Sequence, residues 1–238
     1  MNPILCPLRN GLALTKAALV SFLVQDIGDV SVLFCDNASS DGTGQWLASL
    51  RDPRVSVMSN VQPMSVAQSW NAMLRWTFKQ GAEYALVVNN DVVLRPDTYR
   101  HLVSDGGMFV SAVGCDDPKC VEPPYDDPVP QLKRPNPDYS CYLIMRECWE
   151  RVPFDEDCDI GFFEDNIHHV ALHQAGIKAW CIGVPFYHVG SGTVKNSSLL
   201  DLRSIRKAAD RNREYFFSKY RCYPGTSEYE SLFTEAAV

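Results

Sequence analysis

The first half of the chain alternates between short apolar runs and longer segments with apolar residues at helical spacing. Four runs rich in Val, Leu and Ile, at residues 4–8, 30–35, 55–58 and 84–88, have the length and composition of buried strands. Between them, residues 15–24, 43–50 and 65–80 carry apolar side chains three and four positions apart, which favours helices. Ser65 and Gln68 form a capping-box pattern, and Gly81 stands where a helix C-terminal cap belongs. This alternation predicts βαβ units in an α/β fold with a mostly parallel central sheet flanked by helices.

The second half is less regular. Residues 115–138 are rich in Pro and Asp and predict a long loop, which is either functional or mobile. Strands are expected at 139–145 and 179–184, a helix at 163–175, and a polar amphipathic C-terminal helix at 199–220. We interpret residues 1–220 as one domain with three parts: a ligand-binding half at 1–115, a second half at 116–198, and the C-terminal helix at 199–220. Residues 221–238 then form a tail.

Composition limits the class of protein. The chain has 238 residues with 46% hydrophobic and 21% charged residues, as in an ordinary globular protein. The formal net charge of −7 argues against nucleic acid as the main partner, but leaves room for a local basic pocket or a metal ion. Nine cysteines without a C-x-x-C motif argue against zinc and favour reduced thiols. With no apolar run of about 20 residues and no signal-peptide pattern, we expect a cytoplasmic protein. Peripheral contact with a membrane stays open.

Polar residues follow three of the predicted strands. They occupy residues 7–10, 36–43 and 89–91, directly after the strands at 4–8, 30–35 and 84–88. Because ligands of a parallel α/β sheet bind beyond the carboxyl ends of its strands, these clusters are expected to meet at one edge. Each cluster taken alone is equally typical of turns and helix caps.

Two further groups of residues are candidates for chemistry. Glu164 and Asp165 follow two aromatic residues at the start of the predicted helix at 163–175. They either complement the helix dipole or supply a general base whose pKa is tuned by an apolar wall. His188 comes shortly after the last predicted strand, just before Gly190, and is either structural or a ligand.

Together these residues resemble the family 2 glycosyltransferases of the GT-A fold, close to the rhamnosyltransferase-like branch. The resemblance runs from residue 4 to about residue 220. It is carried by residues 35–43, by residues 89–92, by residues 154–156 followed by 163–165, and by His188 with residues 190–191. The order and spacing of these motifs, more than any one of them, carry the resemblance.

The resemblance implies a role for each matching position. Pro7, Leu8, Arg9, Asp36, Asn71, Asn89 and Asn90 would bind the nucleotide of the donor, with Asp36 accepting a hydrogen bond from the base. Asp91 matches the last acid of the family's D-x-D element and, with His188, would hold Mn²⁺ or Mg²⁺ on the donor diphosphate. Asp165 matches the catalytic base, and Glu164 would orient the acceptor. The first acid of the D-x-D element is Asn89 in this chain.

The expected activity is therefore transfer of a sugar from a nucleotide-diphosphate sugar, with UDP or dTDP favoured, to a hydroxyl of a saccharide or glycan acceptor. One base and in-line attack give inversion at the anomeric carbon. The alternatives are a retaining transferase, a nucleotidyltransferase, and a domain that binds a sugar nucleotide or glycan without turnover. The basic residues of the helix at 199–220 are either a solvated face or a contact, for example by Arg211, with the diphosphate or an anionic acceptor.

Overall fold

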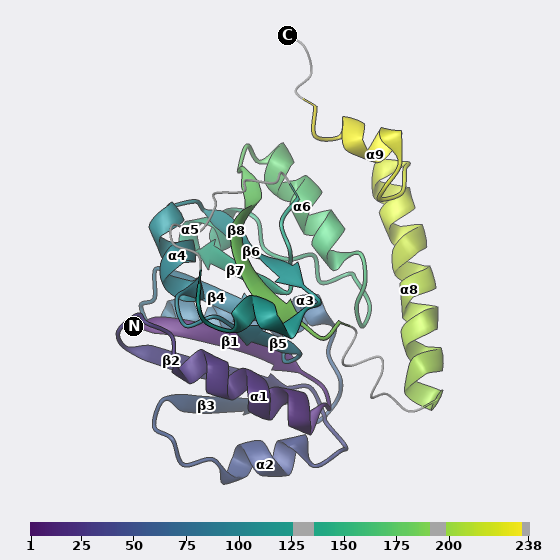
Figure 1. Cartoon of the computed structure of the whole chain (residues 1–238). Helices are drawn as coiled ribbons and strands as arrows, with labels where there is room; N and C mark the ends of the chain where they lie inside the picture. Colours follow the sequence, from purple (N-terminus) through teal and green to yellow (C-terminus); the bar gives the residue numbers. More distant parts are fainter. Residues whose placement is uncertain (126–135, 191–198, 235–238) are drawn as a thin grey trace.

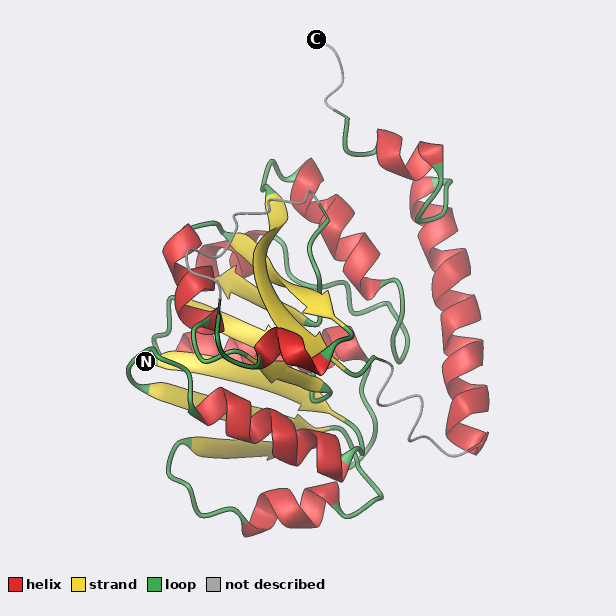
Figure 2. Cartoon of the chain, in the orientation of Figure 1, coloured by secondary structure: helices red, strands yellow, loops and turns green. Residues whose placement is uncertain are grey.

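A mixed sheet of eight strands forms the centre of the molecule (Figures 1 and 2). The computed structural model describes residues 1–125, 136–190 and 199–234. The strands are β1 (Asn2–Leu8), β2 (Val30–Asp36), β3 (Val55–Ser59), β4 (Tyr84–Val88), β5 (Val92–Leu94), β6 (Phe109–Cys115), β7 (Cys141–Met145) and β8 (Ala179–His188). Their order across the sheet is β3-β2-β1-β4-β7-β6-β8-β5.

Helices connect the strands and cover the sheet. They are α1 (Leu12–Leu23), α2 (Thr43–Ser49), α3 (Val66–Lys79), α4 (Thr98–Asp105), α5 (Arg146–Arg151), α6 (Glu164–Gln174), α8 (Leu199–Tyr220) and α9 (Ser227–Ser231), with a 3₁₀ turn, η1 (Pro118–Val121). The capping box at the start of α3 is present, because Gln68 N donates to Ser65 Oγ and Ser65 N donates to Gln68 Oε1. The expected helix at 199–220 coincides with α8.

The expectation of a mostly parallel sheet is only partly met. β3, β2, β1 and β4 pair in parallel as the βαβ pattern predicts, and β6 is parallel to β8. However, β7 is antiparallel to both of its neighbours, β4 and β6, and β5 is antiparallel to β8. A strand that pairs antiparallel needs no crossover helix, and no helical pattern separates β6 from β7 along the chain. The sequence therefore located β7 but not its direction.

The apolar residues form a core on each face of the sheet. On one face, α1, α2 and α4 contribute residues such as Phe22, Leu47 and Tyr99. On the other face, α3, α5 and α6 contribute residues such as Trp70 and Leu172. Burial on both faces explains why the central strands read as continuous apolar runs instead of alternating patterns.

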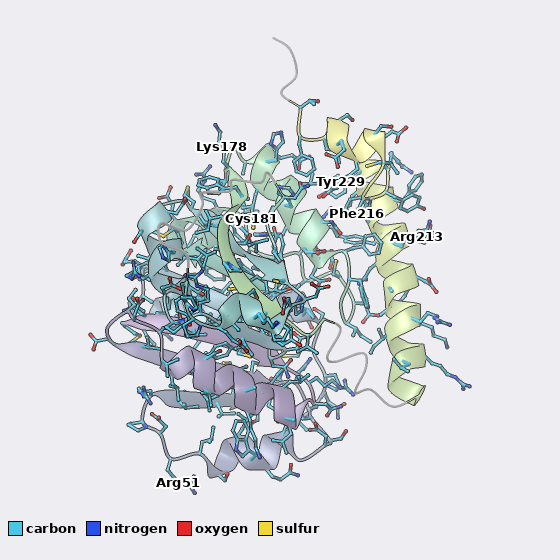
Figure 3. The ribbon with its side chains drawn as sticks, viewed as in Figure 1. Arg51, Lys178, Cys181, Arg213, Phe216 and Tyr229 are labelled. Carbon is cyan, nitrogen blue, oxygen red and sulfur yellow. The ribbon has the colours of Figure 1, made fainter. Side chains whose placement is uncertain are left out.

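The C-terminal segment adds a third layer outside α6. In Figure 1 α8 runs along one side of the molecule, away from the sheet, with α9 at its upper end. Phe216 of α8 and Tyr229 of α9 lie 6.0 Å apart between ring centroids and pack with Ile167 and Val170 of α6 (Figure 3). Residues 221–234, expected as part of a tail, therefore contain a helix that packs on this layer.

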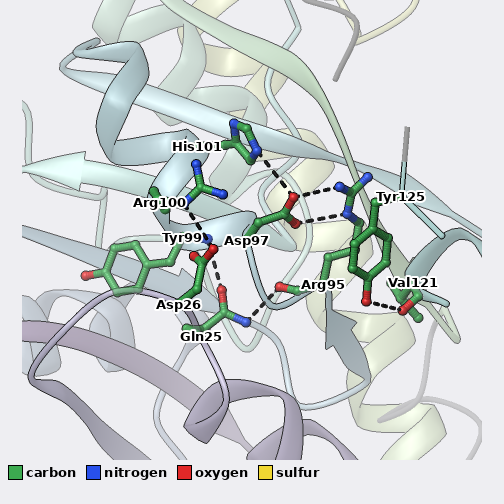
Figure 4. A network of polar contacts seen from close by, with 9 residues as sticks. All are labelled: Gln25, Asp26, Arg95, Asp97, Tyr99, Arg100, His101, Val121 and Tyr125. Carbon is green, nitrogen blue, oxygen red and sulfur yellow. Dashed lines mark hydrogen bonds and ion pairs between the residues drawn. The ribbon is translucent and has the colours of Figure 1, made fainter. Parts of the chain in front are cut away.

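A buried polar network fixes the connection that follows β5 (Figure 4). Gln25, just after α1, donates to Arg95 O at 2.8 Å and accepts from Tyr99 N at 3.0 Å. The Arg95 guanidinium binds both carboxylate oxygens of Asp97, at 3.0 and 2.6 Å, and lies 4.2 Å from the ring centroid of Tyr125. These contacts hold β5 and the start of α4 against α1.

All nine cysteines lie in the described part of the chain as free thiols, and seven of them are buried. None of the helices that the structure describes is long and apolar enough to span a bilayer. Residues 126–135 of the Pro- and Asp-rich segment, and Ser191 of the motif that contains His188, lie outside the described residues.

Candidate active site

A cavity of about 1000 Å³ opens at the carboxyl ends of β1 and β4. The sheet edge contributes residues 7–9 and 89–91, and the opposite wall comes from residues 138–140 and 160–166. His188 and Arg213 also line it. The polar clusters after β1 and β4 therefore meet at one edge, and of the third predicted cluster, after β2, Asn37 lines the cavity.

The structure brings nine of the eleven predicted site residues to this cavity. They are Pro7, Leu8, Arg9, Asn89, Asn90, Asp91, Glu164, Asp165 and His188. The other two, Asp36 and Asn71, are not among the residues that line it.

Asp36 ends β2, and its carboxylate shapes the turn that follows. Asp36 Oδ1 accepts a hydrogen bond from Ser39 N at 3.0 Å, and the side chain is buried. A Cβ placed on Gly44 would come within 2.5 Å of Asp36 Oδ2, so any other residue at the start of α2 would require the Asp36 carboxylate to move. These contacts give Asp36 a structural role in the turn.

Asn71 lies on α3, and its carboxamide holds the segment that follows α5. Its Nδ2 donates to Phe154 O and to Glu156 Oε1, both at 2.8 Å. Its Oδ1 accepts from Trp149 Nε1 at 2.8 Å and from Phe154 N at 3.1 Å. With 2% of its surface exposed, Asn71 braces this segment. The sequence motif gave its position along α3 but not the direction of its amide.

Asn90 both lines the cavity and holds a neighbouring loop. It lines the cavity, and its Nδ2 donates to Asn10 O at 3.0 Å and to Thr15 Oγ1 at 2.9 Å. It thereby ties the end of β4 to the loop between β1 and α1. That loop is also held by Asp41, whose Oδ2 accepts from Gly11 N at 2.7 Å.

Asp91 and His188 are brought together by the register of the sheet. β5 and β8 pair antiparallel with Val92 opposite His188, which places His188 beside Asp91. His188 Nε2 lies 3.3 Å from Asp91 Oδ1, and Val189 N donates to Asp91 O at 3.0 Å. β8 extends four residues beyond the predicted strand end at 184, and this extension brings His188 to the cavity.

This pair fits a divalent cation that takes its remaining ligands from a substrate. A carboxylate oxygen and an imidazole nitrogen are ligands that suit Mn²⁺, and Mg²⁺ is commonly held by one or two carboxylates, waters and phosphate oxygens. In the described residues no group of three or more His, Cys, Asp and Glu side chains is gathered as a metal site. A cation at Asp91 and His188 would therefore depend on the ligands that a diphosphate and water provide.

Glu164 and Asp165 begin α6 on the opposite wall. Burial, followed by the neighbouring charge of Asp165, raises the pKa of Glu164 to about 8. Burial also raises the pKa of Asp165, although Asn166 N donates to its Oδ1 at 2.8 Å. Glu164 Oε2 is buried and makes no hydrogen bond within the described part of the chain. The site thus holds two adjacent carboxyl groups that are both harder to ionise than in water.

The cavity is also lined by Asp138, Tyr139 and Arg213, none of which was predicted individually as a site residue. Asp138 ends the Pro- and Asp-rich segment, Tyr139 begins the strand expected at 139–145, and Arg213 is one of the basic residues of α8. The Arg213 guanidinium lies 4.5 Å from the ring centroid of Tyr223 (Figure 3 labels Arg213). Arg211, the cation suggested from the sequence, instead pairs with Asp159. The helical spacing of α8 did show a buried face, but not which arginine lies nearer the cavity.

Comparisons with known proteins show what the chain resembles. The model of the family described as Glycosyl transferase family 2 matches residues 4–105, which is less than half of the chain. A search of curated proteins finds no match.

Solved structures resemble most of the chain. A mannosyltransferase from Pyrobaculum calidifontis in complex with GDP-Man and Mn²⁺ matches 97% of this chain and 67% of its own, with 17% identity and a TM-score of 0.65. GalNAc-T7 with UDP, GalNAc and Mn²⁺ matches 79% of this chain and 43% of its own, with 11% identity and a TM-score of 0.64. Residues 1–349 of TarS from S. aureus, in complex with UDP, match 79% of this chain and 60% of their own, with 14% identity and a TM-score of 0.59.

The likeness shows that the chain has the α/β fold, with its mixed sheet, of these GT-A glycosyltransferases. The chain spans 43% to 67% of the length of these three chains. At 11% to 17% identity the likeness concerns the fold, and activity has to be argued from the site.

Proposed function

We propose that the protein is an inverting glycosyltransferase of the family 2 type that moves a sugar from a nucleotide-diphosphate sugar to a hydroxyl of a glycan acceptor. The observation that carries the proposal is one cavity with two kinds of acidic site. Asp91 with His188 lies at the sheet edge, and Glu164 with Asp165 lies on the opposite wall. The match of residues 4–105 to the family, and the donor nucleotides and Mn²⁺ of the similar structures, support it.

The sheet edge is assigned to the donor. Pro7, Leu8, Arg9 and Asn89 line the part of the cavity beyond β1 and β4, where a nucleotide would lie. Asp91 and His188 would hold a divalent cation against the diphosphate. When bound, such a cation supplies positive charge that offsets the charge developing on the departing nucleoside diphosphate. On the basis of the resemblance, we propose UDP or dTDP as the nucleotide of the donor and the rhamnosyltransferase-like branch as the nearest part of the family.

Asp165 is assigned as the general base. Because its pKa is raised by burial, its carboxylate is a stronger proton acceptor than an exposed aspartate. As the acceptor hydroxyl attacks the anomeric carbon, Asp165 takes the hydroxyl proton, and the bond to the diphosphate breaks on the opposite face of the sugar. A single displacement of this kind inverts the anomeric configuration. General-base assistance of this type is worth about 10²–10⁴-fold in rate.

Glu164 is assigned to the acceptor. With a pKa of about 8 it keeps its proton at neutral pH, so it does not compete with Asp165 as a base. A protonated carboxyl donates one hydrogen bond and accepts others, which suits orientation of a sugar hydroxyl.

The test combines binding with turnover. The purified protein is unfolded thermally with UDP, dTDP, GDP, CMP and ATP, each with and without Mn²⁺. A nucleotide at a hundredfold excess over its Kd adds about 2.7 kcal/mol, which raises Tm by roughly 5–10 °C. A UDP or dTDP shift that needs Mn²⁺ and disappears in Asp91→Ala supports the donor site. Asp116→Ala, at an exposed aspartate that does not line the cavity, is the matched control and should keep the shift.

Asp165→Asn then separates an enzyme from a binding domain. The variant should bind nucleotide as the parent does but lose transfer, and the product of the parent should show the inverted anomeric configuration by NMR. Binding without transfer in the parent would favour a non-catalytic domain, and a product with retained configuration would exclude the single displacement. No shift with any nucleotide would contradict the proposed donor site.

A further inference from the structure

The loop that leads into Glu164 and Asp165 has an unusual backbone. Ile160, Phe162 and Phe163 have φ of 39°, 74° and 70°, in the left-handed region that residues with bulky side chains rarely adopt. Phe163 is the N-cap of α6, so this conformation directly sets the direction in which α6 and its first two carboxyl groups begin. A loop of this shape needs support from the surrounding structure.

Asn212 of α8 supplies much of that support. Its Nδ2 donates to Asp159 O at 2.6 Å, to Gly161 O at 2.9 Å and to Phe162 O at 3.0 Å. Its Oδ1 accepts from Asp159 N at 2.8 Å. The carboxamide is therefore fully engaged by the backbone of residues 159–162, and Asn212 is only 1% exposed.

Asn212 lies on the buried face of α8. Ala208, Asn212 and Phe216 are spaced four residues apart and form the buried stripe of the helix. A polar residue in a stripe of this kind is costly unless it is hydrogen-bonded. An apolar side chain at 212 would fill the same space but would leave the carbonyl groups of the loop without their donor.

The loop is also held from the other side. Val66 N, at the first position of α3, donates to Ile160 O at 2.8 Å. Phe163 packs on Phe216 with ring centroids 5.7 Å apart. The loop is thus clamped between the start of α3 and the buried stripe of α8.

We propose that Asn212 is a positioning residue of the active site: its carboxamide holds the backbone of residues 159–162 in the shape that directs Glu164 and Asp165 into the cavity. What the two carboxyl groups do there rests on the proposed function, but their placement by Asn212 does not. Asn212 then affects the reaction through the loop and does not itself contact a substrate.

The first test uses Asn212→Asp in the full chain. The aspartate has the shape of asparagine and can still accept from Asp159 N, but it places an oxygen against three carbonyl oxygens. Arg211→Met is the matched control, because Arg211 contacts the same loop only through its exposed ion pair with Asp159. Both variants are compared with the parent by hydrogen exchange of the loop amides and by ¹³C NMR titration of the Glu164 carboxyl, assigned with Glu164→Gln.

In Asn212→Asp, exchange at residues 160–163 should be about tenfold faster or more, as for a segment that opens locally. The pKa of Glu164 should fall from about 8 toward its ordinary value, because a relaxed loop admits water. Arg211→Met should change neither. The other ionisable groups that bear on the pair are Asp138, Tyr139, Tyr142, Cys158 and Tyr229, none of which is altered in either variant.

If the protein transfers sugar, kinetics add a separate readout. Asn212→Asp should lower kcat by about tenfold to a hundredfold, as expected when a reacting group is misplaced. KM for the donor should stay within about twofold, because the residues proposed to bind the donor are placed by the sheet, and Asn212 makes no contact that would hold the donor before the reaction. A parent protein without transfer would count against the proposed function, while exchange and titration would still decide the role of Asn212.

A second variant guards against failure to fold. Val66→Pro removes the bond from Val66 N to Ile160 O and replaces a side chain that lines the cavity beside Gly161. Helix α3 should tolerate the change, because proline is favoured at the first position of a helix and Ser65 already has an extended backbone. The variant should loosen the same loop from the side of α3. If both variants keep the exchange rates of residues 160–163 and the Glu164 titration of the parent, and merely lower Tm, Asn212 is a packing residue and the proposal is wrong.

Discussion

Replacing Glu164 with Gln should stabilise the protein, and increasingly so as the pH rises. The side chain is buried at the start of α6, and burial together with the charge of Asp165 raises its pKa from an ordinary 4.5 to about 8. The native state therefore binds the Glu164 proton more tightly than the unfolded state does. Between pH 4.5 and 8 the native state holds more protons, so the free energy of unfolding falls as the pH rises through this window.

The size of the effect follows from the two pKa values. A tenfold change in proton affinity is worth about 1.4 kcal/mol, so the full change between 4.5 and about 8 corresponds to roughly 5 kcal/mol. About 3 kcal/mol of this develops between pH 5.5 and pH 8.5. Relaxation of the loop and entry of water on ionisation reduce it, and we expect about 1–3 kcal/mol. Glutamine has nearly the same shape as glutamate but no proton to lose. The stability difference between Glu164→Gln and the parent should therefore grow by that amount from pH 5.5 to pH 8.5.

Urea unfolding of both proteins at pH 5.5, 7 and 8.5, with a thiol reductant, measures this difference. Changes in packing or hydrogen bonding by the new amide are the same at each pH and cancel in the comparison. Glu214→Gln, on the exposed face of α8, makes the same chemical change at an exposed position and is the matched control. If the difference for Glu164→Gln is independent of pH, the carboxyl of Glu164 is not held in the desolvated state on which its proposed role depends.

Two further changes test the packing that supports the site. Arg95→Met removes the guanidinium that binds the largely buried carboxylate of Asp97, and should lower the free energy of unfolding by about 3 kcal/mol; a loss below about 1 kcal/mol would show that the pair in Figure 4 is not structural. Ser65→Ala removes the side-chain half of the capping box of α3 and should cost about 1 kcal/mol by the same assay, whereas no loss would mean that water replaces the cap.

The sequence predicted best what depends on local chemistry. The capping box at Ser65 and the apolar spacing of the following residues are properties of one helix, and α3 begins where they indicate. The strands β1 to β4 follow from apolar runs in the same way. The direction of β7 depends on its two neighbours in the sheet, which are distant in sequence, and so the mixed pairing could not be obtained from the run of apolar residues alone.

In the site, too, the sequence indicated which residues lie near the cavity but not all of their contacts. Asp91 and Asp165 follow directly from motifs at the end of a strand and the start of a helix, and both line the cavity. In the folded chain Asp36 binds the turn that follows β2, and Asn71 binds the segment around Phe154. The motifs did not indicate these contacts, because a short polar side chain can bind nearby backbone groups as well as a ligand. That Asp36 and Asn71 contact a nucleotide stays a prediction.

The two walls of the cavity are fixed by different kinds of interaction, and this difference has a consequence for function. Asp91 and His188 are placed by backbone ladders of the sheet, which tolerate changes of the surrounding side chains. Glu164 and Asp165 follow a loop whose main side-chain support is Asn212, 53 residues from Asp159 in the sequence. Substitutions near Asn212 on α8 can therefore alter the carboxyl pair while leaving the proposed donor side intact. Donor binding and proton transfer should for this reason respond separately to mutation, which the variants at 91 and 212 measure.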